Sequence, residues 1–73
     1  MRDYPNAANI IRREMYRCGY VLERLSEKTE ISPAVLRGIL TGRSTTISTR
    51  NMVALARAFD YSASEFIDIL SQE

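Results

Sequence analysis

The chain has 73 residues, of which 45% are hydrophobic and 26% are charged, and its formal net charge is +1. This length fits one domain, and the apolar content excludes a disordered chain. No apolar run is long enough to span a membrane, and a single cysteine, Cys18, excludes an intrachain disulfide.

The charged residues are unevenly distributed along the chain. Residues 1–57 carry ten basic and five acidic side chains, whereas residues 58–73 carry four acidic side chains and no basic one. A basic body with an acidic tail suits a protein that offers one face to an anion and another to a different partner, although chance can give the same asymmetry in a short chain. A lone cysteine fits a reducing compartment, and the polar N-terminus lacks the apolar core of a signal peptide. We therefore expect a cytoplasmic protein without a membrane partner.

Helical periodicity runs through every segment longer than a turn, and no strand alternation appears. We therefore predict a single all-α domain of five helices. The first helix is expected over Ala7–Arg17, with Asn6 as its cap and Gly19 as its stop. The second is expected over Leu22–Thr29, without a polar cap because Val21 precedes it.

The third helix begins with Ser32 as its cap and with Pro33 in its first turn, where the missing N–H does no harm. Gly42 marks its end. The apolar residues expected to face inward from it are Val35, Leu36, Ile39 and Leu40.

The fourth helix begins near Ser48 or Thr49, and the fifth begins at Ser62, which has the spacing of a capping box with Glu65. The apolar stripe of the fourth helix comprises Met52, Ala56 and Phe59. The fifth helix has more apolar residues than one face can hold. Two explanations account for this surplus equally well: the helix is buried on two sides within its own domain, or it forms a dimer contact. These residues are Phe66, Ile67, Ile69 and Leu70.

Residues 21–43 predict two short helices joined by a tight turn, which is the arrangement of a helix-turn-helix motif. Such a motif can place its second helix in the major groove of DNA. On the outward face of that helix Arg37 is the only long donor, and arginine is the side chain that most often reads guanine. Gly38 costs about 1 kcal/mol relative to alanine in a helix interior. A glycine here allows either close approach of the helix backbone to the duplex, which is the explanation we favour, or a tight crossing with a neighbouring helix.

The segment after this helix, residues 42–50, is rich in arginine and hydroxyl groups. Such groups are typical of phosphate contacts, but they are also typical of a solvated loop. With the third helix, this segment gives a set of candidate DNA-contacting residues. They are Ser32, Ala34, Arg37, Gly38, Arg43, Ser44, Thr45, Thr46 and Arg50.

The sequence contains no pattern typical of an enzyme or a metal site. It has no histidine, no glycine-rich phosphate loop and no cluster of metal ligands at a usual spacing. Cys18 shares the inward stripe of the first helix with Ile11 and Met15, so we interpret it as a core residue rather than a nucleophile. The four tyrosines are scattered, which favours packing over a stacking platform. We expect no catalysis, cofactor, metal or small-molecule ligand.

Short motifs occur in a fixed order along the chain. They are Leu25-Ser26-Glu27-Lys28, Ile31-Ser32, Ile39 with Gly42-Arg43, Ala54-Leu55-Ala56-Arg57-Ala58-Phe59 and Ser62-x-x-Glu65-Phe66. Their joint order and spacing, over Ile10–Leu70, resemble the Cro/repressor-type helix-turn-helix family of XRE-like regulators. The resemblance implies a compact five-helix, lambda-repressor-like fold. It also implies that Ser32–Leu40 is the recognition helix and that Arg43–Thr46 lies on the sugar-phosphate backbone.

The chain departs from the family pattern at three places. Glu30 stands at the turn where the family often has glycine, so we expect backbone strain there. Val21 and Leu22 replace a polar cap and a glutamine, which puts a usual phosphate contact in question. Met15 and Leu40 stand where the family often pairs an arginine with a glutamate. Because a whole buried pair can be exchanged for apolar groups without loss, we expect these two side chains to touch.

These patterns predict that residues 1–73 form one helix-turn-helix domain of a sequence-specific transcriptional regulator. We expect it to bind double-stranded DNA as a homodimer and to act as a repressor. The alternative is a protein-interaction module on the same fold, antitoxin-like or anti-repressor-like, because Pro33, Ala34 and Gly38 offer few hydrogen bonds to DNA.

Overall fold

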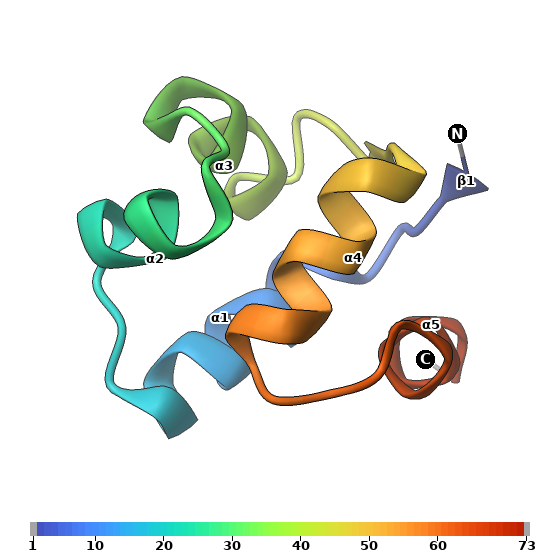
Figure 1. The fold of residues 1–73 in the computed structure, drawn as a ribbon. Helices are drawn as coiled ribbons and strands as arrows, with labels where there is room; N and C mark the ends of the chain where they lie inside the picture. The colour runs from blue at the N-terminus through green and yellow to red at the C-terminus, as the bar shows by residue number, and fades with distance from the viewer. Residues whose placement is uncertain (1, 73) are drawn as a thin grey trace.

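The computed structural model describes residues 2–72 as five helices and two very short strands (Figure 1). The helices are α1 (Ala7–Cys18), α2 (Leu22–Thr29), α3 (Pro33–Leu40), α4 (Thr49–Ala58) and α5 (Ala63–Ser71), and the strands are β1 (Arg2–Asp3) and β2 (Thr46–Ile47). The predicted five-helix architecture is confirmed, and α1 runs one residue further than expected. Within the described range, each helix is too short or too polar to cross a bilayer.

Serine hydroxyls cap three of the helices, as the sequence predicts. Ser32 and Ser48 each accept a hydrogen bond from the backbone N–H three residues further on, at the starts of α3 and α4. At α5, the N–H of Ser62 donates to the Glu65 carboxylate at 2.9 Å, and the N–H of Glu65 donates to the Ser62 hydroxyl at 3.1 Å. Hydrogen bonding from Ser62, chiefly from its backbone N–H, lowers the pKa of the Glu65 carboxyl group. Asn6 holds the cap position of α1, but its side chain makes no capping hydrogen bond.

The strands were not predicted, and they join the N-terminal segment to the loop between α3 and α4. β1 and β2 are antiparallel, with Arg2 opposite Ile47 and Asp3 opposite Thr46. The ladder continues where the N–H of Tyr4 donates to the carbonyl oxygen of Thr45 at 2.7 Å. Two-residue strands are too short for an alternation of apolar and polar residues, so periodicity could not reveal them.

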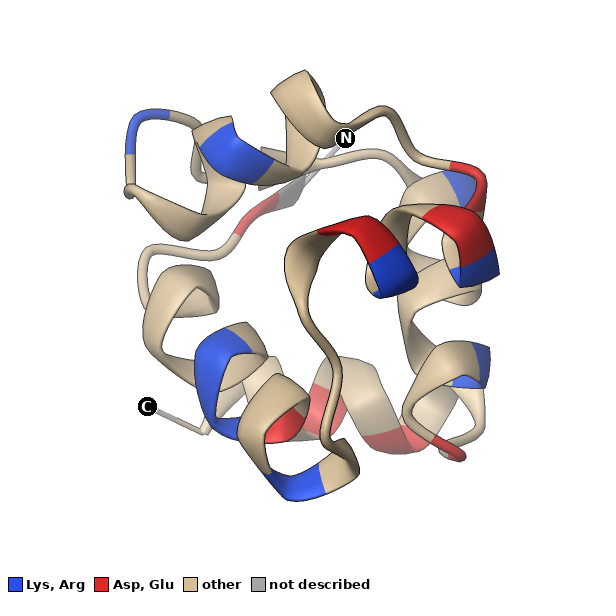
Figure 2. Ribbon diagram, turned by 90° about the vertical axis from the view of Figure 1, so that its left-hand side faces the viewer, with Lys and Arg blue, Asp and Glu red and all other residues tan. Residues whose placement is uncertain are grey.

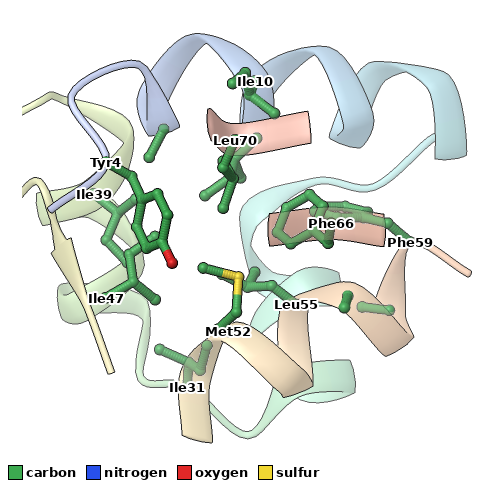
Figure 3. Close-up of a cluster of buried hydrophobic side chains, with 14 of the residues drawn as sticks. Tyr4, Ile10, Ile31, Ile39, Ile47, Met52, Leu55, Phe59, Phe66 and Leu70 are labelled. Carbon is green, nitrogen blue, oxygen red and sulfur yellow. The ribbon is translucent and has the colours of Figure 1, made fainter. Parts of the chain in front are cut away.

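One hydrophobic core joins all five helices, β2 and Tyr4 (Figure 3). The ring centroids of Phe59 and Phe66 lie 5.7 Å apart, between α4 and α5. Tyr4 lies on the same side of the core as Ile47, so the N-terminal segment is anchored by its side chain as well as by its backbone. The largest fully buried side chains are Phe59, Phe66, Ile10, Ile11, Leu25, Leu36, Met52 and Leu55.

Two residues that were expected to pack are in fact exposed. Val35 is 47% exposed, because the narrow buried face of the eight-residue helix α3 is occupied by Leu36 and Ile39. Tyr16 on α1 is 92% exposed and therefore is not a packing residue. Cys18 is half-buried against the core, as expected.

A buried carboxylate ties α1 to the turn between α4 and α5. Glu14 is only 4% exposed, and its Oε1 accepts hydrogen bonds from the Nε of Arg17 at 2.6 Å and from the hydroxyl of Tyr61 at 3.0 Å. Arg17 also donates to the carbonyl oxygen of Phe59 at 2.9 Å. Burial and the bond to Glu14 raise the pKa of the Tyr61 hydroxyl. This polar cluster fixes the start of α5 relative to α1.

The turn of the helix-turn-helix motif has the strained backbone that its sequence predicts. Glu30 ends α2 in the left-handed conformation, with φ at 59°. The turn keeps this shape because the hydroxyl of Ser26 donates to the carbonyl oxygen of Ile31 at 2.6 Å, and Ile31 is buried. A residue with a Cβ pays a steric penalty at this φ that glycine avoids.

We expect Glu30→Gly to raise the free energy of unfolding by about 0.5–1 kcal/mol. Glycine removes the steric penalty in the folded state, and this gain exceeds the cost of the greater conformational entropy that glycine gives to the unfolded chain. Denaturant unfolding of both proteins measures the change. Glu30→Asn is the control for the loss of charge, and it should give a smaller gain because asparagine tolerates this conformation. A destabilised Glu30→Gly protein would contradict the assignment of strain.

Candidate nucleic-acid interface

The helix-turn-helix unit presents α3 on the surface and holds it from beneath. Figure 1 shows α2 and α3 next to each other, joined by the short turn at Glu30. α3 packs against both α1 and α2, and its buried contacts are made by Leu36 and Ile39. The opposite face of α3 is therefore available to a ligand of the domain.

The outward face of α3 carries the residues that the sequence assigned to it. Ser32, Pro33, Ala34 and Arg37 are all exposed. The hydroxyl of Ser32 is occupied as the helix cap, since it accepts from the N–H of Val35 at 3.2 Å. Within residues 2–72, no hydrogen bond or ion pair engages the guanidinium group of Arg37, so it can reach a ligand without breaking an internal contact.

Gly38 is not required by the packing of a neighbouring helix. A Cβ at this position would meet only the Cβ of Ser44, at 3.9 Å, which is an ordinary van der Waals distance. The neighbour is the loop after α3, whose Ser44 N–H donates to the Gly38 carbonyl oxygen at 3.0 Å. The tight-crossing explanation for this glycine therefore finds no support within the described part of the chain.

The loop after α3 is fixed at both ends. It leaves α3 through Gly42, whose φ of 77° is in the left-handed region, and it returns to the core at the buried Ile47. Between them Arg43 and Thr46 are exposed, whereas Thr45 is half-buried where its carbonyl oxygen accepts from Tyr4. The loop therefore holds its polar side chains in a defined arrangement.

Arg50 follows this loop closely in sequence and shares a hollow with the start of α3. It is exposed in the first turn of α4 and lines a polar hollow of about 380 Å³ together with Ser32, Val35 and Glu30. Residues from the N-terminal ends of α3 and α4 both line this hollow. The structure thus brings Ser32 and Arg50 together, and Glu30 adds an acidic group that the sequence did not assign to the site.

Met15 and Leu40 are both half-buried and line one hollow of about 420 Å³ at the junction of α1 and α3. An arginine of α1 still engages the end of α3, but from another position. Arg12 donates from Nε and Nη2 to the carbonyl oxygen of Leu40, at 3.1 and 2.7 Å. A cationic side chain is favoured at this carbonyl end of a helix. Sequence reasoning missed this contact because its acceptor is a backbone atom.

In the part of the chain that the structure describes, the basic residues come from several separate elements. Figure 2 shows Lys and Arg on several separate elements, with acidic residues among them. On α2, for example, Arg24 pairs with Glu27 at 3.5 Å. The stretch from Ile31 to Phe59, which includes α3, the loop and α4, differs because it contains four arginines and no acid.

The residues predicted for a dimer contact divide into two pairs. Phe66 and Leu70 are 0% and 3% exposed, because they pack into the core of their own chain. They therefore have little surface to offer a partner, and the apolar surplus of α5 is in large part internal. Ile67 and Ile69 are half-buried and keep some accessible surface.

The comparisons with known proteins concern both the fold and this motif. A protein-family model described as Helix-turn-helix matches residues 11–66, which run from α1 into α5. No curated protein sequence matches the chain.

Two solved structures share the fold. One is described as the crystal structure of the master regulator for biofilm formation SinR in complex with DNA, and the other as the SinR protein/SinI protein complex. Each has a TM-score of 0.76 and 22% sequence identity, and each alignment covers 85% of this chain. It covers 98% of the chain in the DNA complex but only 60% of the chain in the SinR/SinI complex.

Proposed function

Because the chain belongs to the XRE-type helix-turn-helix family of DNA-binding regulators, we propose that it inserts α3 into the major groove of duplex DNA and represses transcription as a homodimer. The observation that carries this proposal is the exposed face of α3 with its unengaged Arg37. Arg43 in the loop after α3 and Arg50 in the first turn of α4 are the proposed phosphate contacts. The structural neighbour SinR, which is described in complex with DNA, is a precedent for DNA binding by a protein of this fold.

The proposed homodimer rests on the remaining accessible surface of α5. We assign the contact to Ile67 and Ile69, because Phe66 and Leu70 are buried in their own chain. Two-fold symmetry would then place two copies of α3 on two half-sites about one helical turn apart.

A second candidate function is a protein-interaction module without DNA affinity. It is favoured by the sparse hydrogen-bonding capacity of Pro33, Ala34 and Gly38 and by the exposed Tyr16, which gives α1 an aromatic contact surface. The SinR/SinI complex shows that a protein of this fold can bind another protein.

A salt titration of duplex binding separates the two functions. Phosphate contacts release counterions, so the affinity of a DNA-binding protein should fall steeply as salt increases. Selection of bound sites from a random duplex pool then gives the sequence preference, and symmetric half-sites would support the homodimer. A chain that binds no duplex even at low salt would refute the proposed function and favour the interaction module.

We expect Arg37→Ala to cost about 1–3 kcal/mol of binding free energy on the selected site and to relax the sequence preference at one base pair. The physical reason is the loss of a bidentate hydrogen-bonding contact from the guanidinium group to a base edge. Repeating the site selection with the variant measures the preference. Arg57→Ala is a matched control, since it removes an exposed arginine from the C-terminal end of α4. An Arg37→Ala protein with unchanged preference would remove this residue from base readout.

Gly38→Ala should raise the free energy of unfolding by up to about 1 kcal/mol, because alanine favours a helix and its Cβ finds ordinary space beside Ser44. We expect the same variant to bind DNA less tightly, since the added methyl group would hold the helix backbone away from the duplex. Thermal unfolding and duplex titration report the two effects separately. Greater stability with unchanged affinity would contradict close approach at this position.

Arg43→Ala and Arg50→Ala should weaken binding to all duplexes by similar factors. Each removes a proposed phosphate contact, so the slope of the logarithm of affinity against the logarithm of salt should fall by about one unit per variant. Titrations on the selected site and on a scrambled duplex test this expectation. A loss confined to the selected site would instead indicate that the arginine reads a base.

A further inference from the structure

The N-terminal strand places an acidic side chain beside the proposed phosphate-binding loop. Asp3 lies directly opposite Thr46 in the antiparallel pair, and both residues are exposed. Side chains of directly opposite residues project to the same face of a sheet, with Cβ atoms about 4.5–5.5 Å apart. The Asp3 carboxylate is thus a fixed neighbour of Thr46.

The position of β1 is well determined by its surroundings. The N–H of Tyr4 donates to the Thr45 carbonyl oxygen at 2.7 Å, and Tyr4 is only 5% exposed. Ile47 on the facing strand is only 3% exposed. Asp3 therefore cannot move away from the loop unless the strand pairing and a core contact are both lost.

We propose that Asp3 limits the attraction of the loop for DNA phosphates and so weakens the sequence-independent part of binding. This inference rests on the proposed DNA-binding function. A phosphate held by Thr46 would lie within one Debye length of the Asp3 carboxylate, so salt at physiological strength would screen the repulsion only in part. Among the side chains that the structure describes, none forms an ion pair with Asp3, so its charge remains to act on the ligand.

The consequence of this repulsion is selectivity. Phosphate contacts supply nearly all of the affinity for random DNA, whereas base contacts carry the sequence information. An acidic group beside the loop lowers binding to every duplex and leaves the outward face of α3 to discriminate among sequences.

The test compares Asp3→Asn with Asp60→Asn in the otherwise unchanged chain. Asp60 is exposed in the turn after α4, at the opposite end of that ten-residue helix from the loop. Its φ of 66° is left-handed, which asparagine tolerates, so the control removes the same charge without added strain. Asp3→Thr is a second neutral variant that favours the strand conformation.

Fluorescence anisotropy with a random-sequence duplex of about two helical turns, at several salt concentrations, gives the affinity of each protein. We expect Asp3→Asn and Asp3→Thr to bind about three- to tenfold more tightly than the wild type at low salt, with convergence at high salt. Asp60→Asn should change the affinity less than twofold.

Provided that the wild-type chain binds DNA, two results would overturn the inference. Either the Asp3 variants bind with the same affinity as the Asp60 control, or both Asp3 variants bind more weakly than the wild type. A loosened strand cannot imitate the expected result, because a less ordered loop would bind less tightly. A wild-type chain without affinity for the duplex at low salt would instead refute the proposed function, and this inference with it.

Discussion

The arrangement of the proposed interface depends on how a helix of only eight residues is held in place. A helix as short as α3 is marginal in water on its own, because nucleation is costly and few backbone hydrogen bonds follow. Here Leu36 and Ile39 fix it to the core, Ser32 caps its start, and Arg12 engages the carbonyl group of Leu40 at its end. The buried side of α3 thus provides its order, and the outward side is free to serve a ligand.

Much of the fold could be predicted because its signals are local. Apolar spacing, the serine caps and the glycines at 19 and 42 are all read from residues close together in the chain, and they locate the five helices. Val35 marks the limit of this reasoning. It belongs to the apolar stripe by spacing, but the structure buries a narrower face than the stripe allows.

The features that could not be predicted depend on contacts between distant parts of the chain. Asp3 and Thr46 pair across 43 residues, and Glu14 meets Tyr61 across 47. A carboxylate such as Glu14, placed between arginines on a helix, has the sequence pattern of a solvated residue. Only the return of the chain after α4 brings a tyrosine hydroxyl to it and makes its burial favourable. For the candidate site, the residues of α3 and the loop could be named from the sequence, whereas the support of the loop by β1 could not.

The pairing of β1 with β2 has a practical consequence for the handling of the protein. Any peptide fused ahead of Arg2 would leave the molecule next to Thr46 and Ile47, beside the loop proposed to contact DNA. The charges of an affinity tag at that end would change the electrostatic potential at the proposed DNA-binding surface. The end of α5 lies away from the loop in Figure 1, so a purification tag or fluorophore is better attached there.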